Sequence, residues 1–153
     1  MIIFHALVGT IALVTGAWNL MARKGTPIHK LIGYLYVLSM AVLVLTSFSI
    51  FELFGGFGPY HAMSLVSGIT ISLAVYFPLR REKYENWLGH HYMWITWSYV
   101  GLLMATGSHL FEYGPVGWPF WARALLYWGV PLVSGAFLIY KNQHKTIAAY
   151  SKS

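Results

Sequence analysis

Histidine is the residue type of this sequence most suited to chemistry, because six of its seven copies fall near the ends of long apolar segments. His5 and His61 each follow an aromatic residue at the start of one segment, and His29 and His91 each lie at the start of another. Imidazole is a ligand for haem iron, Zn²⁺ and Cu²⁺. Because the chain has no cysteine, thiolate metal sites, iron–sulfur clusters and disulfides are excluded.

The segments that carry these histidines are predicted to be membrane-spanning helices. Hydrophobic residues make up 58% of the chain and charged residues only 9%, which does not fit a soluble globular protein. Five apolar runs cover residues 2–21, 29–51, 61–79, 89–111 and 120–140, each close to the ~20 residues that cross a ~30 Å hydrocarbon layer. Because the connections are short, neighbouring helices must run antiparallel. We therefore predict one all-α transmembrane domain over residues 1–153, with five helices and a short cytoplasmic tail at 141–153.

The basic residues predict the orientation of this domain. Nine of the ten lie in the first connection, in the third connection or in the tail, which the antiparallel order puts on one side of the membrane. Only Arg123 falls on the other side. By the positive-inside rule, we expect a multi-pass protein of the cytoplasmic (inner) membrane, with its N-terminus outside and its C-terminus in the cytoplasm. The net charge of +6 is explained by this topology and needs no nucleic-acid partner.

A helix pair is repeated along the chain, in halves at about residues 1–52 and 59–111. Phe4-His5-Ala6-Leu7 corresponds to Tyr60-His61-Ala62-Met63, and His29-Lys30-Leu31 corresponds to His91-Tyr92-Met93. Further on, Tyr36-Val37-Leu38 falls near Ser98-Tyr99-Val100 when the two halves are compared. Since both halves have the same orientation, the repeat predicts a pseudo-two-fold axis along the membrane normal. The first four helices then form a core bundle, and the helix at 120–140 is an addition that Pro131 is expected to kink.

The repeat sorts four histidines into two pairs, and two b-type haems are the first hypothesis for their function. A bis-histidine haem needs imidazoles from two facing helices. His5 and His61 would hold an outer haem, and His29 and His91 an inner one. The two layers would be about 25 Å apart at ~1.5 Å per residue, so that electrons could cross the membrane.

Four further residues are candidates for contact with such a cofactor. Gly9 and Gly33 each lie one turn from a histidine and leave room for a flat ligand. Asn19, near the inner face, could contact a haem propionate or a substrate anion. Arg123 could hold a propionate or pair with Glu112.

Two resemblances bear on this hypothesis. The plan of a four-helix core with outer and inner histidine pairs resembles the two-haem transmembrane cytochromes b of the ascorbate- and ferric-reductase type, which implies electron transport and an oxidoreductase function. A quinone, a small reductant, ferric iron or a partner redox protein would then be the redox partner. Three runs of sequence are similar to small predicted bacterial membrane proteins of unknown function. These runs are Gly16-Ala17-Trp18-Asn19-Leu20, Lys24-Gly25-Thr26-Pro27-Ile28-His29-Lys30-Leu31-Ile32-Gly33-Tyr34 and Gly58-Pro59-Tyr60-His61.

The alternative hypothesis is a metal site without haem. His5, His61 and His109 could converge on Zn²⁺ or Cu²⁺ at the outer face, with Glu112 as a base or a further ligand and with hydrolysis or redox chemistry as the reaction. At the inner face, three other histidines could form a similar group. They are His29, His90 and His91, and either of the last two could be the inner haem ligand.

A third interpretation is non-catalytic. Imidazoles near a membrane interface can simply form hydrogen bonds between helices, as in a transport or assembly protein. The lipid bilayer is then the only partner that the composition requires. The fifth helix, which has few polar residues, is a candidate surface for a homodimer or for a partner membrane protein.

Overall fold

The computed structural model describes residues 1–50 and 56–151, and over these residues the chain is helical, without strands. Four long helices come first: α1 (Ile2–Met21), α2 (Pro27–Ser47), α3 (Pro59–Leu79) and α4 (Trp87–Leu110). A short 3₁₀ turn, η1 (Phe111–Tyr113), follows α4. The chain then returns through α5 (Phe120–Ala124), a π-helical turn η2 (Leu125–Gly129) and α6 (Val130–Ser151).

Length and composition make these helices suitable for crossing a membrane. Within the part of the chain that the structure describes, four stretches meet both requirements, namely α1, α2, residues Tyr60–Leu79 of α3 and the continuous run Phe120–Tyr150. Helix α4 is 24 residues long but more polar than α1, α2 and α3, because it carries histidines, serines and threonines. It nevertheless packs along α1, α3 and α6, so it must cross the same layer as its neighbours.

The ends of the helices follow from local sequence signals. Pro27 occupies the first position of α2, and the backbone N–H of His29 donates to Thr26 Oγ1 at 3.2 Å, so α2 begins before the predicted residue 29. Helix α2 ends at Ser47, short of the predicted residue 51, which itself lies outside the described residues. At the other terminus the helix continues to Ser151, so residues 141–151 are helical where we expected a tail.

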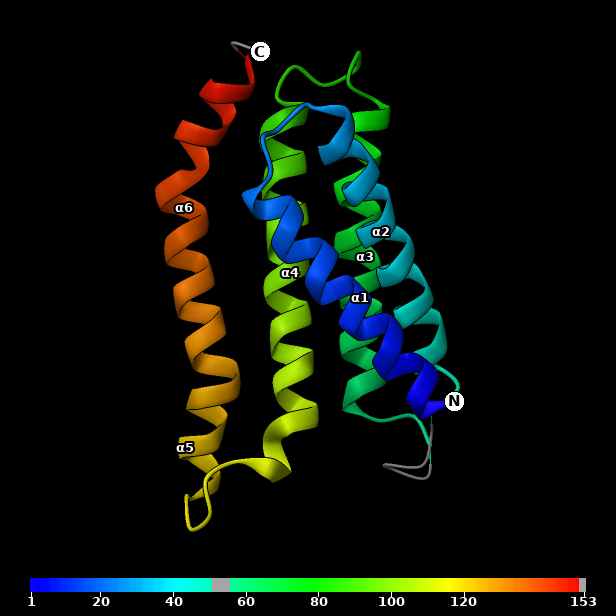
Figure 1. The fold of residues 1–153 in the computed structure, drawn as a ribbon, viewed down its shortest axis with the longest axis vertical. Helices are drawn as coiled ribbons and strands as arrows, with labels where there is room; N and C mark the ends of the chain where they lie inside the picture. The colour runs from blue at the N-terminus through cyan, green and yellow to red at the C-terminus, as the bar shows by residue number, and fades with distance from the viewer. Residues whose placement is uncertain (51–55, 152–153) are drawn as a thin grey trace.

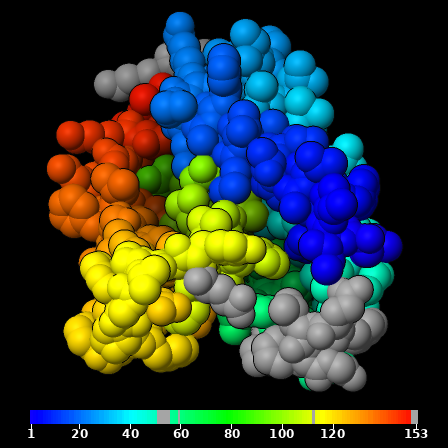
Figure 2. Space-filling model, turned by 60° about the horizontal axis from the view of Figure 1, so that its bottom comes forward, coloured from blue at the N-terminus to red at the C-terminus, as the bar shows by residue number. Residues whose placement is uncertain are grey.

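The first four helices form a ring that agrees with the predicted repeat. Helix α1 pairs with α2 and α3 pairs with α4, while contacts of α2 with α3 and of α1 with α4 close the ring. Figure 1 shows that the connections at residues 22–26 and 80–86 lie at the same end as the C-terminus. We call this end, which carries most of the basic residues, the basic end. The opposite end, where the N-terminus and residues 111–119 lie, is called the far end (Figures 1 and 2).

The centre of the ring is filled by side chains from all four helices. Ala12, Tyr36, Met40, Ile71 and Leu102 form the buried cluster. These five side chains pack together between the four helices, and such close fit stabilises contacts between helices in a membrane.

The C-terminal run stands beside the ring and packs mainly on α4 (Figure 1). Two glycines of this contact permit a close approach: a Cβ on Gly107 would lie 2.6 Å from the Tyr127 carbonyl oxygen, and a Cβ on Gly135 would lie 2.5 Å from Val100 Cγ2. The π-helical turn ends at Gly129, two residues before Pro131, where we predicted a kink. Proline has no N–H to bond to the carbonyl four residues earlier, so regular α-helical bonding is interrupted at this point.

Candidate functional site

Two of the predicted ligands, His29 and His91, lie at the basic end on α2 and α4. The Nδ1 atom of His91 is 2.7 Å from the Ala74 carbonyl oxygen of α3. A carbonyl can only accept, so Nδ1 carries the proton and the lone pair of the neutral ring lies on Nε2. His29 interacts electrostatically with both His91 and Lys24. The structure therefore brings His29 and His91 close enough to interact electrostatically.

Polar groups of α1 and of the following loop border this histidine pair. Lys24 Nζ donates to the carbonyl oxygens of Asn19 at 2.7 Å and Leu20 at 2.8 Å, and so satisfies the C-terminal end of α1. Burial lowers the pKa of Lys24 from its ordinary value of 10.5. A Cβ on Gly33 would lie 3.2 Å from Asn19 Nδ2, so Gly33 lets α2 approach Asn19 closely.

Two buried polar atoms at the basic end have no hydrogen-bond partner within the described part of the chain. They are Asn19 Oδ1 and His29 Nδ1, and only 9% of Asn19 is exposed. Leaving a buried polar atom without a partner is costly, so such atoms usually indicate a ligand or an ordered water. These two atoms make the basic end a candidate binding site.

His90 and His91 point in different directions although they are adjacent. The His90 ring is exposed and stacks on Phe77, with ring centroids 4.4 Å apart and planes 20° apart. The His91 side chain instead reaches across to α3. This orientation favours His91 over His90 as the residue that serves a site inside the bundle.

At the far end, His5 is held by α2 and contacts a histidine of α4. Its Nδ1 lies 2.8 Å from Thr46 Oγ1, and the Thr46 hydroxyl donates its own hydrogen to the Val42 carbonyl oxygen at 2.8 Å. Nδ1 of His5 is therefore the donor, and its Nε2 carries the lone pair. The centroid of the His5 ring is 6.1 Å from that of His109, with the ring planes at 64°. The Tyr60 ring also stacks on His109, with ring centroids 6.4 Å apart.

His61 makes a different kind of contact. Its Nδ1 accepts a hydrogen bond of 3.0 Å from the backbone N–H of Gly58, so its side chain caps the N-terminus of α3. The ring is 3% exposed, stacks on Phe57 at 5.0 Å and contacts Phe48 at 5.9 Å. In a neutral ring with an accepting Nδ1, the proton is on Nε2. The joint ligation of one group by His5 and His61 stays a prediction.

The remaining predicted residues are more scattered. Gly9 is in ordinary contact with Leu43, since a Cβ at this glycine would lie 3.4 Å from Leu43 Cδ1. Arg123 lies close to Gly114, since a Cβ at this glycine would be 3.3 Å from Arg123 Cδ, and its buried Nε has no partner in residues 1–50 or 56–151. The side chain of Glu112 lies outside what the structure describes. Among the described residues, no three histidine or acidic side chains come close enough to hold a metal ion, so the metal alternative has no preassembled cluster there.

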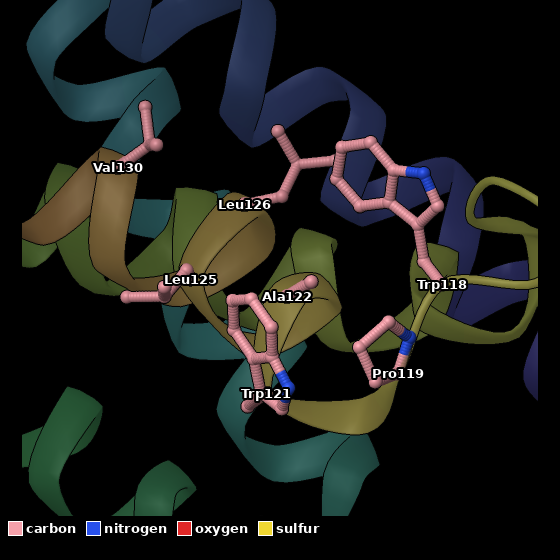
Figure 3. Close-up of a pocket in the computed structure, with 7 residues that line it drawn as sticks. All are labelled: Trp118, Pro119, Trp121, Ala122, Leu125, Leu126 and Val130. Atoms are coloured by element: carbon pink, nitrogen blue, oxygen red, sulfur yellow. The ribbon is translucent and has the colours of Figure 1, made fainter.

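An apolar groove lies apart from the histidines, at the start of the C-terminal run. It has a volume of about 510 Å³ and is lined by Trp118, Trp121, Leu125, Leu126 and Val130, among others. Figure 3 shows the side chains of Trp118 and Trp121 with Ala122 between them, and Leu125 on the side of Trp121 away from Trp118. Because the lining is almost wholly apolar, the groove offers contact with hydrocarbon and no chemistry.

The apolar spans agree with the result of a comparison with known protein families. Residues 2–125 match the family described as "Predicted membrane protein (DUF2306)". The chain belongs to this family. The match covers the DUF2306 chain from α1 to the end of α5, with six of its seven histidines, and ends before α6. No curated protein and no solved structure matches the chain significantly.

Sequence reasoning missed the cap made by His61 and the contact of His5 with Thr46. The cap had a signal, because Gly58-Pro59-Tyr60-His61 places an acceptor three residues after a helix-starting Gly-Pro. The Thr46 contact had none, since it joins residues 41 positions apart.

Proposed function

We propose that this DUF2306 protein is a membrane-embedded b-type cytochrome that binds two haems and moves electrons between the two ends of its bundle. The observation that carries this proposal is the His91–Ala74 hydrogen bond of 2.7 Å. It fixes the ring of His91 inside the bundle with the Nε2 lone pair available, at the same end as His29.

This arrangement matches what a ligating histidine requires. Ligating imidazoles usually donate their second ring N–H to a carbonyl or carboxylate, which sets the tautomer and the ring orientation. His91 has such a partner in Ala74. Its companion His29 comes from the repeat-related helix α2, and the buried Nδ1 of His29 and Oδ1 of Asn19 still need partners beyond the described side chains. These features support a bound group at the basic end.

The surrounding residues would bind and orient this group. His29 and His91 would hold the iron, which supplies one-electron redox chemistry when haem is bound. Lys24 has its ammonium group at the C-terminal end of α1, within electrostatic range of both histidines, where it can hold a carboxylate. A quinol or another small reductant would exchange electrons at the exposed ends.

The test is spectroscopic. The full chain, expressed with a supply of haem and purified in detergent, should show a Soret band and an α band that sharpens on reduction with dithionite. His29→Ala and His91→Ala should remove the same spectral component. His90→Ala is the matched control, because His90 is adjacent but exposed, and it should leave the spectrum unchanged. A protein that stays colourless after reconstitution with haem would overturn the proposal.

A further inference from the structure

We infer that the connection between α3 and α4 binds the headgroup of an anionic phospholipid. This connection, residues 80–86, lies at the basic end (Figure 1). It borders a hollow of about 540 Å³, which is lined by the end of α3 and the start of the loop, namely Pro78, Leu79, Arg80, Arg81, Glu82 and Lys83. Because these lining residues include none of the candidate haem ligands, the inference goes beyond the proposed function and does not depend on it.

The charges around the hollow favour an anion. Arg80, Arg81 and Lys83 are exposed cations, and Glu82 contributes the one carboxylate among these lining residues. Three positive charges less one negative charge leave the lining with a net charge of +2. A guanidinium group can bind a phosphate through two parallel N–H donors, which a point charge cannot do. The two adjacent arginines therefore suit a phosphate group.

Backbone and ring contacts hold the loop in place before any ligand binds. The backbone N–H of Lys83 donates to the Arg80 carbonyl oxygen at 2.9 Å, so a tight turn keeps these two residues close together. The hydroxyl groups of Tyr84 and Tyr76 are hydrogen-bonded at 3.1 Å, and the Tyr84 ring lies 5.3 Å from that of Phe77. The loop is thus fixed on the last turns of α3, and binding needs little further ordering of the chain.

The apolar side of the hollow favours a lipid over a free anion. Pro78 and Leu79 end the candidate membrane span Tyr60–Leu79, and 75% of Leu79 is exposed. Arg80 and Arg81 follow directly, so the hollow lies where the hydrocarbon layer gives way to headgroups. A phospholipid places its acyl chains and its phosphate on the two sides of this same boundary. Basic residues that directly follow a span are a typical arrangement for recognising anionic lipids.

The experiment measures lipid binding to the full chain in detergent by native mass spectrometry. The probes are phosphatidylglycerol and phosphatidylcholine with identical acyl chains, and inorganic phosphate is added as a competitor. Phosphatidylglycerol should bind more tightly than phosphatidylcholine. The double variant Arg80→Gln/Arg81→Gln should weaken phosphatidylglycerol binding by roughly 20- to 30-fold, since each basic residue near a membrane surface contributes about fivefold. Both side chains are exposed, so the variant should fold like the natural chain.

The matched control is Lys141→Gln/Lys145→Gln, which removes two exposed positive charges from α6 and none from the hollow. It should change phosphatidylglycerol binding by no more than about twofold. Equal losses in the two double variants would assign the effect to the charge of the basic end as a whole and would overturn the inference. Equal binding of the two lipids would overturn it as well. Displacement of phosphatidylglycerol by an equal concentration of inorganic phosphate would show a site for a free anion, which also contradicts a lipid site.

Discussion

The hydroxyl groups of Tyr36 and Ser98 form a hydrogen bond of 2.9 Å in the centre of the bundle. The two residues occupy equivalent positions in the repeat, because Tyr36 is 36 − 29 = 7 residues after His29 and Ser98 is 98 − 91 = 7 residues after His91. Residues related by a two-fold axis meet only where that axis passes. This bond therefore marks the pseudo-two-fold axis of the ring, and α2 and α4 contact each other across it.

The Tyr36–Ser98 bond should contribute measurably to stability. Tyr36→Phe removes one partner while Ser98 keeps its bond to the Ile95 carbonyl, so we expect a loss of about 0.5–1.5 kcal/mol in the free energy of unfolding. Ser98→Ala leaves the buried Tyr36 hydroxyl without a partner and should cost about 1–3 kcal/mol. Denaturant unfolding in detergent measures both values.

A double-mutant cycle tests whether the two effects are coupled. The combined variant should be less destabilised than the sum of the single changes, since both remove the same bond. Tyr34→Phe is the control, because Tyr34 is 69% exposed, and it should change stability by no more than about 0.5 kcal/mol. Strict additivity of the two core substitutions would argue against the bond.

Any side chain at position 16 should lower the stability of the protein. A Cβ at this position would lie 2.5 Å from Tyr99 Cδ2 and 2.9 Å from Tyr36 Cε2, and the Tyr99 ring is held in place by a bond from its hydroxyl to the Leu13 carbonyl. We expect Gly16→Ala to lower the unfolding free energy by about 1–3 kcal/mol. Gly101→Ala is the matched control in a helix, since no atom lies within 4 Å of its Cβ position. If the two alanines behave alike in thermal unfolding, the close packing of α1 against both tyrosines is refuted.

Lys24 should make stability depend on pH in the alkaline range. Burial lowers its pKa below the 10.5 of the unfolded chain, so between these two values the unfolded state binds more protons. Burial of the charged Lys24 ammonium group therefore lowers the free energy of unfolding at neutral pH, and this loss disappears as the pH rises toward 10.5. Stability should therefore rise over this interval relative to Lys24→Arg, which stays charged throughout. Unfolding curves of the two proteins at several pH values give the difference, and parallel pH profiles would contradict the expectation.

The orientation predicted from the basic residues can be tested with single cysteines, because the natural chain has none. Val116→Cys, at a fully exposed position of the far end, should react with a membrane-impermeant maleimide on intact cells. Glu82→Cys, exposed in the connection at the basic end, should react only after the membrane is permeabilised. The reverse pattern of labelling would place the basic end outside.

Much of this architecture was predictable from the sequence, because hydropathy and helix-end signals act locally. The apolar runs located the start of each helical span to within two residues, and Thr26-Pro27 marked the start of α2, but the last helix runs 11 residues beyond the predicted residue 140. The histidine order revealed the repeat. This repeat makes Tyr36 and Ser98 equivalent, and the hydrogen bond between them in the core agrees with that equivalence. The basic residues identified one end of the bundle, since charge must lie outside the hydrocarbon layer whatever the packing.

The tertiary structure alone decided how each imidazole is used. A sequence cannot say which ring nitrogen meets a partner, because that depends on the rotation and crossing of separate helices. Only the packing turns His91 toward the Ala74 carbonyl and leaves His90 on the surface beside Phe77. Packing likewise sets His5 beside His109 and His61 against the start of α3. Residue types fixed the number of candidate ligands, and the distances between helices determined which of them can act together.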